Sequence, residues 1–403
     1  MQPWPLKKIP CLDARALTAI LQSIAWTVLG RHESLPLPFV ETETFAACSW
    51  ESMGCGGEDR AEIARRFAAM FNVPPTVPEA GEAAGALAER TLAAWRNSGS
   101  LVTFFTSGST GKPKPCTHPE DHLRQEITAL APLAAGCRAV LTSAPLQHLY
   151  GFSHALLVSC ALGVPLRIQP SLPTVLAAQM RPGDLVVSIP LLWTRLAELI
   201  REGMELVDGT DITIVTGSSP VSAEAMHILR GKGFRLREFF GASETGIICW
   251  RTTPEEPFSL FPHLRRGQKA GHEQELERIL PDGSSIWYPL LDSIVWLDER
   301  RLFPRGRRDS AVQVGSVNVF PRRVEKVLAQ HEGVRECSVR LMRPEEGERL
   351  KAFVVPASGW EEKKLRPALQ AFAHDLLSDA ERPARYAFGK DLPRSPLGKP
   401  VDW

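Results

Sequence analysis

Short runs of β-branched and apolar residues alternate with helix-like stretches through the middle of the chain. The runs have the length and composition of buried strands, and the stretches between them carry apolar residues at helical spacing. The runs are residues 101–105, 138–143, 184–189 and 211–215, and the helical stretches are 120–132, 191–202 and 221–231. This alternation predicts an α/β fold with a largely parallel sheet and helices on its faces.

The two ends of the chain differ from this middle part. Residues 1–100 carry amphipathic helical patterns around Ile20 and Phe67, and predict helices joined by loops. After about residue 250 the sequence becomes irregular and polar. Beyond that region, helices are expected at 321–331 and 361–378 and strands at 334–342 and 350–356, which together make a small α+β unit.

A chain of 403 residues exceeds one ordinary hydrophobic core, so we expect more than one domain. Residues 1–306 are expected to form a large N-terminal domain of mixed, largely parallel sheets flanked by helices, with a reduced subdomain at 1–100. Residues 307–403 are expected to form a small, mobile α+β domain, with a boundary near 306–310.

Composition excludes several classes of protein. The net charge of +1 and the balance of 47 basic against 46 acidic residues disfavour a nucleic-acid-binding polycation. The most apolar segment, residues 154–166, is too short and interrupted to span a bilayer, and residues 1–14 lack the apolar core of a secretory signal. Eight scattered cysteines without a CxxC pair predict reduced thiols, so we expect a cytoplasmic protein without a membrane segment.

The segment TFFTSGSTGKPKP, residues 103–115, combines glycines, hydroxyl side chains and lysines between a strand and a proline-broken run. Bendable backbone, hydroxyls, amide groups and lysine all favour phosphate oxygens. A Walker A loop does not fit, because Thr106 stands where its first glycine belongs and Pro113 follows Lys112.

This loop resembles the phosphate-binding signature of the adenylate-forming superfamily, which includes acyl-CoA synthetases, adenylation domains of peptide synthetases and luciferases. Further segments resemble that superfamily's motifs in the same order, so that the resemblance covers residues 101–403. They are PLQHLYGFSHALL (145–157), TGSSP (216–220), FFGASETG (239–246), Asp292, GRRD (306–309), VFPRRVEKVLAQHEGV (319–334) and LPRSPLGKP (392–400).

The resemblance implies that the protein activates a carboxylic acid with ATP and Mg²⁺, makes acyl-AMP, and passes the acyl group to a thiol. The expected catalytic groups are Lys399, Glu244, Ser243 and Thr110, with Glu244 and Thr110 assigned to Mg²⁺. Lys399 would stabilise charge between the carboxylate and the α-phosphate. The expected ATP ligands are Thr106, Ser107, Gly108, Ser109, Thr110, Gly111, Lys114, Ser218, Ser219, Pro220, Phe239, Phe240, Gly241, Ala242, Ser243, Asp292 and Arg307.

The C-terminal domain of this superfamily rotates about a hinge, here Asp309, between the two reactions. Two segments depart from the usual pattern. LLDS replaces the TGD expected around Asp292, and VQVGSVNV carries Gln313 where a lysine is usual. The thioester step therefore has less sequence support than adenylation.

The acid pocket is expected to include His148, Tyr150, Gly151, Phe152 and Gly217. Residues 145–157 contain no carboxylate that would bind an ammonium group, which disfavours an α-amino acid. The LYGFSHAL pattern resembles aryl ligases that act on benzoate and on 3- or 4-hydroxybenzoate. His148 could adjoin the acid carboxylate or be a structural histidine, and His154 could meet a ring hydroxyl.

The thiol could belong to coenzyme A or to the phosphopantetheine of an acyl carrier protein. Compact relatives of this kind resemble aryl-acid ligases of pigment-type clusters that load a carrier protein. Arginine clusters, such as those at 265–266 and 300–301, could receive an acidic carrier helix or coenzyme A phosphates. Two other readings are a medium-chain acyl-CoA synthetase and a noncatalytic acyl-adenylate-binding relative, and the protein could be a monomer or a homodimer.

Overall fold

In the computed structural model the chain folds into two compact units. The first comprises residues 1–105, 115–290 and 294–303, and the second residues 106–114, 291–293 and 304–403. Each unit has a hydrophobic core of its own. The structure describes residues 12–30, 41–106, 114–217, 221–267, 275–308, 311–315, 317–343 and 346–393.

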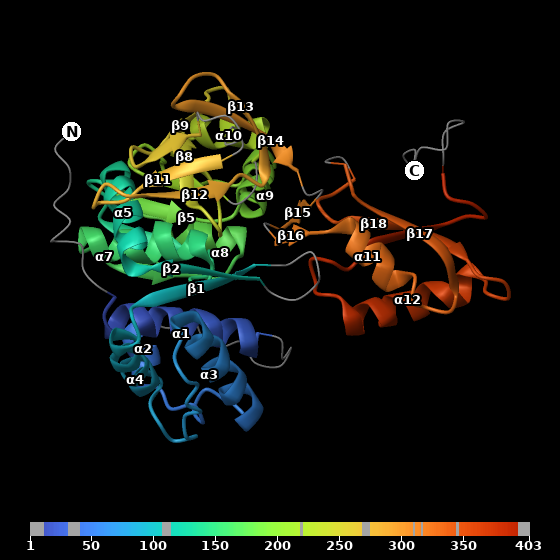
Figure 1. The fold of residues 1–403 in the computed structure, drawn as a ribbon, viewed down its shortest axis with the longest axis horizontal. Coiled ribbons are helices and arrows are strands. Elements are labelled where there is room, and N and C mark those ends of the chain that lie inside the picture. The colour runs from blue at the N-terminus through green and yellow to red at the C-terminus, as the bar shows by residue number, and fades with distance from the viewer. Residues whose placement is uncertain are drawn as a thin grey trace. The chain divides into compact units, whose positions relative to one another are not determined.

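Among the described residues, four helices precede the sheets and gather on one side of the first unit (Figure 1). They are α1 (Ala14–Leu29), α2 (Thr42–Ala47), α3 (Gly57–Phe71) and α4 (Ala84–Asn97). Asp13 caps α1 by accepting a 2.8 Å hydrogen bond from the amide of Ala16. The helices pack through aromatic residues, since the Phe71 ring lies 5.9 Å from that of Trp95. The expectation of helices and loops before residue 100 is confirmed.

Nine strands form the main sheet, in the order β13-β14-β9-β8-β7-β6-β5-β3-β4. Strands β4, β3, β5, β6 and β7 pair in parallel, whereas β7, β8, β9 and β14 pair antiparallel. The bounds are β3 Ala139–Thr142, β4 Leu166–Ile168, β5 Asp184–Val187, β6 Thr213–Thr216, β7 Arg235–Ala242, β8 Gly246–Arg251, β9 Phe258–Leu260, β13 Asp292–Trp296 and β14 Arg301–Arg307.

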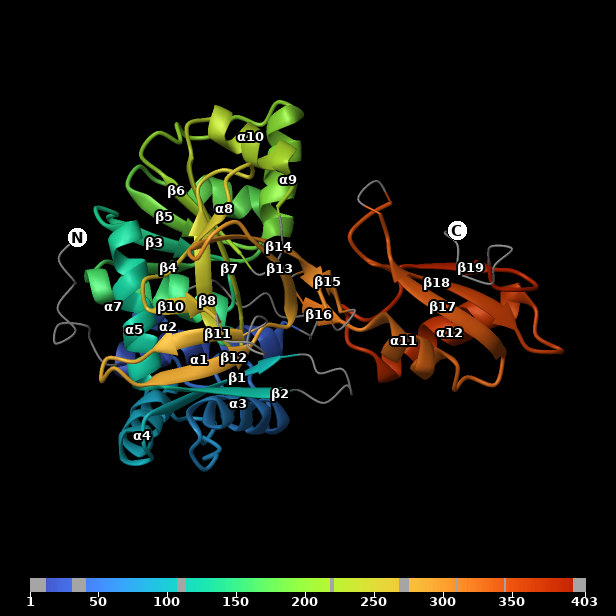
Figure 2. The same ribbon diagram turned by 45° about the horizontal axis from the view of Figure 1, so that its top comes forward.

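Helices cover both faces of the parallel strands, because alternate residues of each strand point to opposite sides. Ile214 and Trp193 belong to the core beneath α8 (Pro173–Gln179), α9 (Pro190–Arg201) and α10 (Ala223–Gly231), which lie together in Figure 2. Val215 faces the other core. That core includes residues of α5 (Glu120–Leu130), the 3₁₀-helix Ala131–Ala134, α6 (Leu149–Gly151), the π-helix Phe152–Leu157 and α7 (Val158–Leu162). The predicted α/β class is confirmed.

Two expectations were wrong. The run at 101–105 is not part of the main sheet: β1 (Leu101–Thr106) pairs with β2 (Lys114–Pro119) in a separate two-stranded sheet. Local alternation marks a run as extended but does not select its partner strand. The region after residue 250 is also rich in strands, including β10 (Leu264–Arg266), β11 (Glu275–Ile279) and β12 (Ser285–Pro289). These strands are short, and β10 and β11 carry charged residues that interrupt any apolar run.

The second unit contains the expected α+β elements. A three-stranded sheet of β17, β18 and β19 has α11 and α12 packed into one core with it, where Val354 and Leu369 are fully buried. The bounds are β15 Val312–Val314, β16 Val317–Val319, α11 Pro321–Leu328, β17 Val334–Leu341, β18 Leu350–Pro356, α12 Glu362–Leu376 and β19 Arg385–Phe388. Within the described residues of the whole chain, no helix is long and apolar enough to cross a membrane.

Candidate active site

The turn between β7 and β8 carries the residues expected at the α-phosphate and the metal. Its ends are joined by hydrogen bonds from Thr245 N to Ala242 O (3.1 Å) and from Ala242 N to Thr245 Oγ1 (3.3 Å). Gly241 is needed at this point, because a β-carbon there would collide with the carbonyl oxygen of Gly246. The turn therefore holds Ser243 and Glu244, both half-buried, at the end of β7.

His118 holds this turn from strand β2. Its Nε2 lies 2.6 Å from the carbonyl oxygen of Ser243, a residue 125 positions away, so Nε2 must carry the proton. His118 is only 4% exposed, and desolvation lowers the pKa of its imidazole. A neutral imidazole with its proton on Nε2 is thus the form that stabilises the turn.

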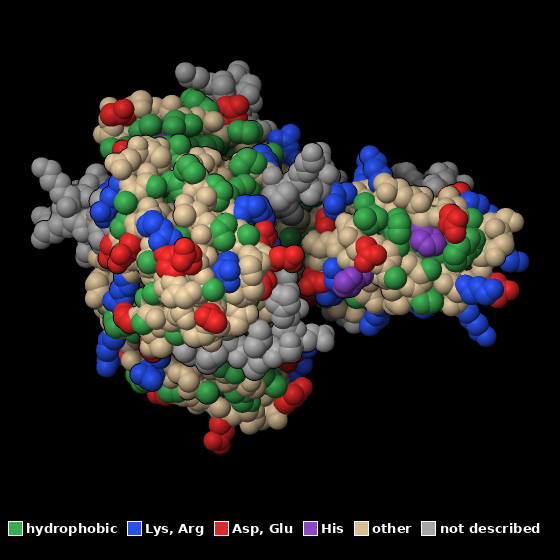
Figure 3. Space-filling model, turned by 90° about the horizontal axis from the view of Figure 1, so that it is seen from below, with side chains coloured by type: hydrophobic (Ala, Val, Ile, Leu, Met, Phe, Trp, Pro, Cys, Tyr) green, Lys and Arg blue, Asp and Glu red, His purple; other side chains and the backbone are tan. Residues whose placement is uncertain are grey.

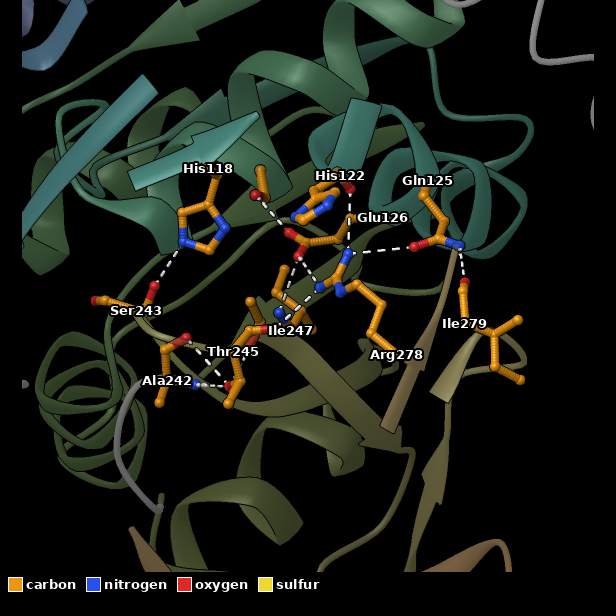
Figure 4. Close-up of polar contacts among 12 residues, drawn as sticks. His118, His122, Gln125, Glu126, Ala242, Ser243, Thr245, Ile247, Arg278 and Ile279 are labelled. Atoms are coloured by element: carbon orange, nitrogen blue, oxygen red, sulfur yellow. Dashed lines mark hydrogen bonds and ion pairs between the residues drawn. The ribbon is translucent and has the colours of Figure 1, made fainter. Parts of the chain in front are cut away.

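A buried carboxylate and a buried guanidinium hold the other side of the turn (Figure 4). Glu126 of α5 accepts hydrogen bonds from Ser153 Oγ (2.7 Å) and from the amide of Ile247 (3.0 Å). Arg278 of β11 lies 3.9 Å from Glu126 and donates a 2.9 Å hydrogen bond to the carbonyl oxygen of Thr245. Both side chains are at most 2% exposed, so each charge depends on the other for compensation.

Sequence reasoning missed this polar cluster of His118, Glu126 and Arg278. Two local signals were available. Glu126 occupies an apolar position of its helix, in register with Leu123, Ile127 and Leu130, and Arg278 shares a strand face with Leu276. A charged residue at a core position predicts a buried partner, although the sequence does not say which one.

Aromatic rings form a wall at the carboxyl ends of β5 and β6. The hydroxyl of Tyr150 lies 2.9 Å from Ser188 O and 3.0 Å from Val215 O. Its ring centre is 4.7 Å from that of His154, which is 4.3 Å from that of Phe239. Gly217 must be glycine, because a β-carbon would lie 2.9 Å from Cε2 of Tyr150. Ligands of α/β sheets bind at such carboxyl ends.

Three other residues expected at the acid pocket, His148, Gly151 and Phe152, are close to Tyr150 in the sequence, but their surroundings in the structure differ from one another. Gly151 cannot carry a side chain, since a β-carbon would collide with Pro145 O. Phe152 is fully buried and packs 5.1 Å from the ring of Phe104, as a core residue does. The His148 side chain is exposed.

Phe240 lies in β7, half-buried, with its ring 6.1 Å from that of Phe258. The other expected site residues divide into two groups. Thr106, Lys114, Asp292 and the backbone of Arg307 belong to the second unit. Thr106 Oγ1 lies 3.5 Å from Lys114 O, at the end of β1 and the start of β2. Outside the described residues lie Ser107, Gly108, Ser109, Thr110, Gly111, Ser218, Ser219, Pro220, Asp309 and Lys399.

Comparison with known proteins identifies the class. Residues 61–270 match the AMP-binding enzyme family, and residues 323–399 match the AMP-binding enzyme C-terminal domain. The chain therefore belongs to the AMP-binding enzymes, the adenylate-forming superfamily. It is an ATP-dependent, AMP-forming acid–thiol ligase.

Two relatives and one solved structure show which members of this family the chain is similar to. The chain is 34% identical over 346 residues to a 4-coumarate–CoA ligase of Halorhodospira halophila, a match that covers 85% of this chain and 86% of the relative. It is 35% identical over 320 residues to a 4-coumarate–CoA ligase of Rhodobacter capsulatus, covering 77% and 78%. The structure of the amide bond synthetase McbA from Marinactinospora thermotolerans shares the fold, with a TM-score of 0.62, 20% identity, and coverage of 95% and 92%.

Proposed function

We propose that this ligase activates an aryl carboxylic acid of the hydroxycinnamate or hydroxybenzoate type and transfers it to coenzyme A. The main support is the similarity to proteins named 4-coumarate–CoA ligase along most of both chains. The aromatic wall of Tyr150, His154 and Phe239 at the sheet's carboxyl edge is suited to a flat, apolar substrate.

In the first step, a carboxylate oxygen of the acid attacks the α-phosphorus of ATP. The bond from this phosphorus to the bridging oxygen breaks, and pyrophosphate leaves with that electron pair. Two anions must approach each other, so the protein has to neutralise and orient them. We assign this work to Ser243, to the loop residues around Thr110, and to Lys399.

Magnesium would bind at Glu244. Mg²⁺ prefers oxygen ligands and usually combines one or two carboxylates with substrate phosphates and waters. The turn fits this requirement, because Glu244 directly follows Ser243 and both are only half-buried, within reach of solvent. The ion would neutralise phosphate charge, while the turn itself keeps Glu244 beside Ser243.

In the second step, the thiol sulfur attacks the acyl carbon and AMP leaves, which yields the thioester and a proton. We propose that residues 307–403 form the domain that moves between the two steps, with Asp309 as its hinge. This motion would withdraw Lys399 after adenylation and open a path for the thiol.

Coenzyme A is our first choice of acceptor, and a carrier-protein phosphopantetheine is the alternative. Both offer the same thiol, so chemistry at the acyl carbon does not distinguish them. The face of the molecule in Figure 3 mixes basic and acidic side chains, a pattern that does not favour a strongly acidic carrier on that side. A cytoplasmic location suits ATP and coenzyme A, and the seven described cysteines are all free thiols.

Acid-dependent exchange of labelled pyrophosphate into ATP tests the first step. We expect exchange with 4-coumarate or 4-hydroxybenzoate, and weaker exchange with medium-chain fatty acids. Mass detection of the thioester with coenzyme A, and separately with a phosphopantetheinylated carrier protein, then identifies the acceptor. Exchange with fatty acids alone would favour the medium-chain alternative and overturn the aryl assignment.

Lys399→Ala tests the role of the terminal lysine. We expect exchange to fall by about 10²-fold or more while nucleotide binding persists, because the lysine stabilises charge that develops during reaction. Lys390→Ala is the matched control, since Lys390 is exposed. Equal activity of both variants would remove Lys399 from the mechanism.

A further inference from the structure

Helix α1 carries a buried serine that bonds to a distant loop. Ser23 is only 6% exposed, so its hydroxyl needs partners within the protein. Its Oγ accepts a 3.0 Å hydrogen bond from the amide of Leu146 and donates a 2.7 Å hydrogen bond to Oε1 of Gln147. These partners lie 123 and 124 positions further along the chain. They belong to residues 143–148, which connect β3 to α6 and are called the β3–α6 loop below.

A closed ring of hydrogen bonds completes this contact. Nε2 of Gln147 donates a 2.9 Å hydrogen bond to Oγ1 of Thr27, which lies one turn after Ser23 on α1. Oγ1 of Thr27 in turn donates a 2.9 Å hydrogen bond to the carbonyl oxygen of Ser23. Each hydroxyl hydrogen is used once, and the Gln147 side chain has both its donor and its acceptor engaged. The directions of the bonds therefore agree, and they fix the loop to one position on α1.

The β3–α6 loop lies directly against the segment that carries the aromatic wall. A β-carbon on Gly151 would collide with the carbonyl oxygen of Pro145 and would lie 3.1 Å from that of Ala144. The loop also closes on itself through a 3.2 Å hydrogen bond from the amide of His148 to the carbonyl oxygen of Pro145. Because packed segments transmit displacements, a shift of this loop must also shift α6 and Tyr150.

We propose that Ser23 is a positioning residue for binding of the acid. It fixes the β3–α6 loop and thereby keeps the aromatic wall in the arrangement that receives the acid. The inference rests on the proposed function, which places the acid against this wall. Ser23 does not contact the substrate, because its hydroxyl is engaged with Leu146 and Gln147.

The groups that we assign to ATP have separate support. The polar cluster described above holds the turn between β7 and β8, and its members lie on β2, α5 and β11 rather than on α1. Loss of the Ser23 hydroxyl should therefore weaken binding of the acid and leave binding of ATP unchanged. This separation distinguishes a positioning role from a general contribution to stability.

Ser23→Ala is the decisive variant. It removes the oxygen that both loop residues share and leaves the amide of Leu146 buried without its acceptor. Alanine favours the helix, so α1 itself is retained. Thr18→Val is the matched control, because Thr18 lies on the same helix, is 4% exposed, and donates its hydroxyl hydrogen to the carbonyl oxygen of Ala14 within α1. Both variants remove a buried hydroxyl, but only Ser23→Ala breaks a bond to the loop.

Pyrophosphate exchange supplies the readout: KM for the acid, KM for ATP, and kcat, with thermal unfolding as the check of folding. The acid is whichever aryl or fatty acid the wild type exchanges fastest, so the test does not depend on the aryl assignment. We expect Ser23→Ala to raise KM for the acid by about tenfold, with KM for ATP and kcat within about twofold of the wild type. Thr18→Val should leave all three within about twofold.

Gln147→Met is the second variant. It removes the side-chain bonds to α1 but keeps the bond from the Leu146 amide to Ser23, so KM for the acid should rise by only about threefold. If Ser23→Ala does not fold, an unchanged KM for the acid in Gln147→Met would overturn the inference.

Two results with folded Ser23→Ala would also overturn it. An unchanged KM for the acid would mean that Ser23 contributes to stability alone, and an equal rise in both KM values would mean that the whole site has loosened. Either result leaves the proposed function intact. Absence of exchange with every acid would instead overturn the proposed function, and this inference with it.

Discussion

The turn between β7 and β8 and the aromatic wall are built in opposite ways. In the turn, both oxygens of the Glu126 carboxylate have protein partners, and His118 and Arg278 each hold a backbone carbonyl. In the wall, the imidazole of His154 has one nitrogen bonded and the other unpaired within the described residues. The carboxylate in the turn's support is therefore bonded at both oxygens, although Nε of Arg278 is buried without a partner within the described residues, whereas the imidazole in the wall is bonded at only one nitrogen.

This difference suits the two tasks. In our proposal the turn handles phosphate and metal and must keep the same geometry for every substrate, and the buried network of His118, Glu126 and Arg278 supports that geometry. A pocket that selects one acid benefits from a buried polar group that only the right acid can hydrogen-bond, because any other acid leaves that group unpaired at a cost in free energy. Four experiments can test the contrast, beginning with the largest expected effect.

Arg278→Met should destabilise the protein by about 3–5 kcal/mol, because it leaves the buried carboxylate of Glu126 without its counter-charge. Urea unfolding of the purified variant measures this change. The double variant Glu126→Gln, Arg278→Met should recover part of the loss, since no buried charge then remains uncompensated. A loss below about 1 kcal/mol in the single variant would show that the turn does not depend on this pair.

Acidification should destabilise the protein through its buried histidines. Desolvation lowers the pKa of His118, and lowers that of His154 to about 3, whereas both take up protons near pH 6.5 in the unfolded chain. Their contribution to stability is present above pH 6.5 and is lost as the pH falls toward the folded pKa. Between its unfolded and folded pKa values, each such histidine lowers the free energy of unfolding by about 1.4 kcal/mol for every unit that the pH falls. The loss of stability between pH 7 and pH 5 should therefore be about 2 kcal/mol smaller in His154→Asn than in the wild type. An unchanged pH dependence in urea unfolding would contradict a neutral, buried His154.

Tyr150→Phe should cost about 1 kcal/mol of stability, because it removes one hydroxyl that bonds to Ser188 O and Val215 O. The tyrosine orients the wall and, in our proposal, does not recognise a hydroxyl of the acid. The variant should therefore lower kcat/KM for hydroxylated and unhydroxylated acids by the same factor. A selective loss for hydroxylated acids would show instead that Tyr150 recognises that hydroxyl.

Glu198→Gln provides the surface reference for the buried pair. Glu198 forms a 2.7 Å ion pair with Arg195 on α9, and both side chains are at least 36% exposed. Solvent screens such a pair, so the change in unfolding free energy should stay below about 1 kcal/mol and shrink with added salt. An effect as large as that of Arg278→Met would mean that burial does not explain the strength of the turn's support.

The sequence alone predicted α5, β3, β5, α9, β6 and α10 of the α/β segment and α11, β17, β18 and α12 of the second unit, because apolar periodicity reports directly which face of a segment is buried. It did not predict β4, α8, β7 or β19. It failed where that signal is absent. β11, for example, buries the charged Arg278 beside Leu276 and so lacks an apolar run. The run at 101–105 was correctly read as extended but was assigned to the wrong sheet.

The motifs of the adenylate-forming superfamily, and hence the class of enzyme, could also be predicted from the linear sequence. The buried side chains that hold the turn of one of these motifs in place could not. His118 meets Ser243 across 125 positions, and Glu126 meets Ile247 across 121. Local patterns record whether a residue is buried, but the partner of a buried charge, and the nitrogen of His154 that stays unpaired, depend on contacts between distant segments that exist only once the chain has folded.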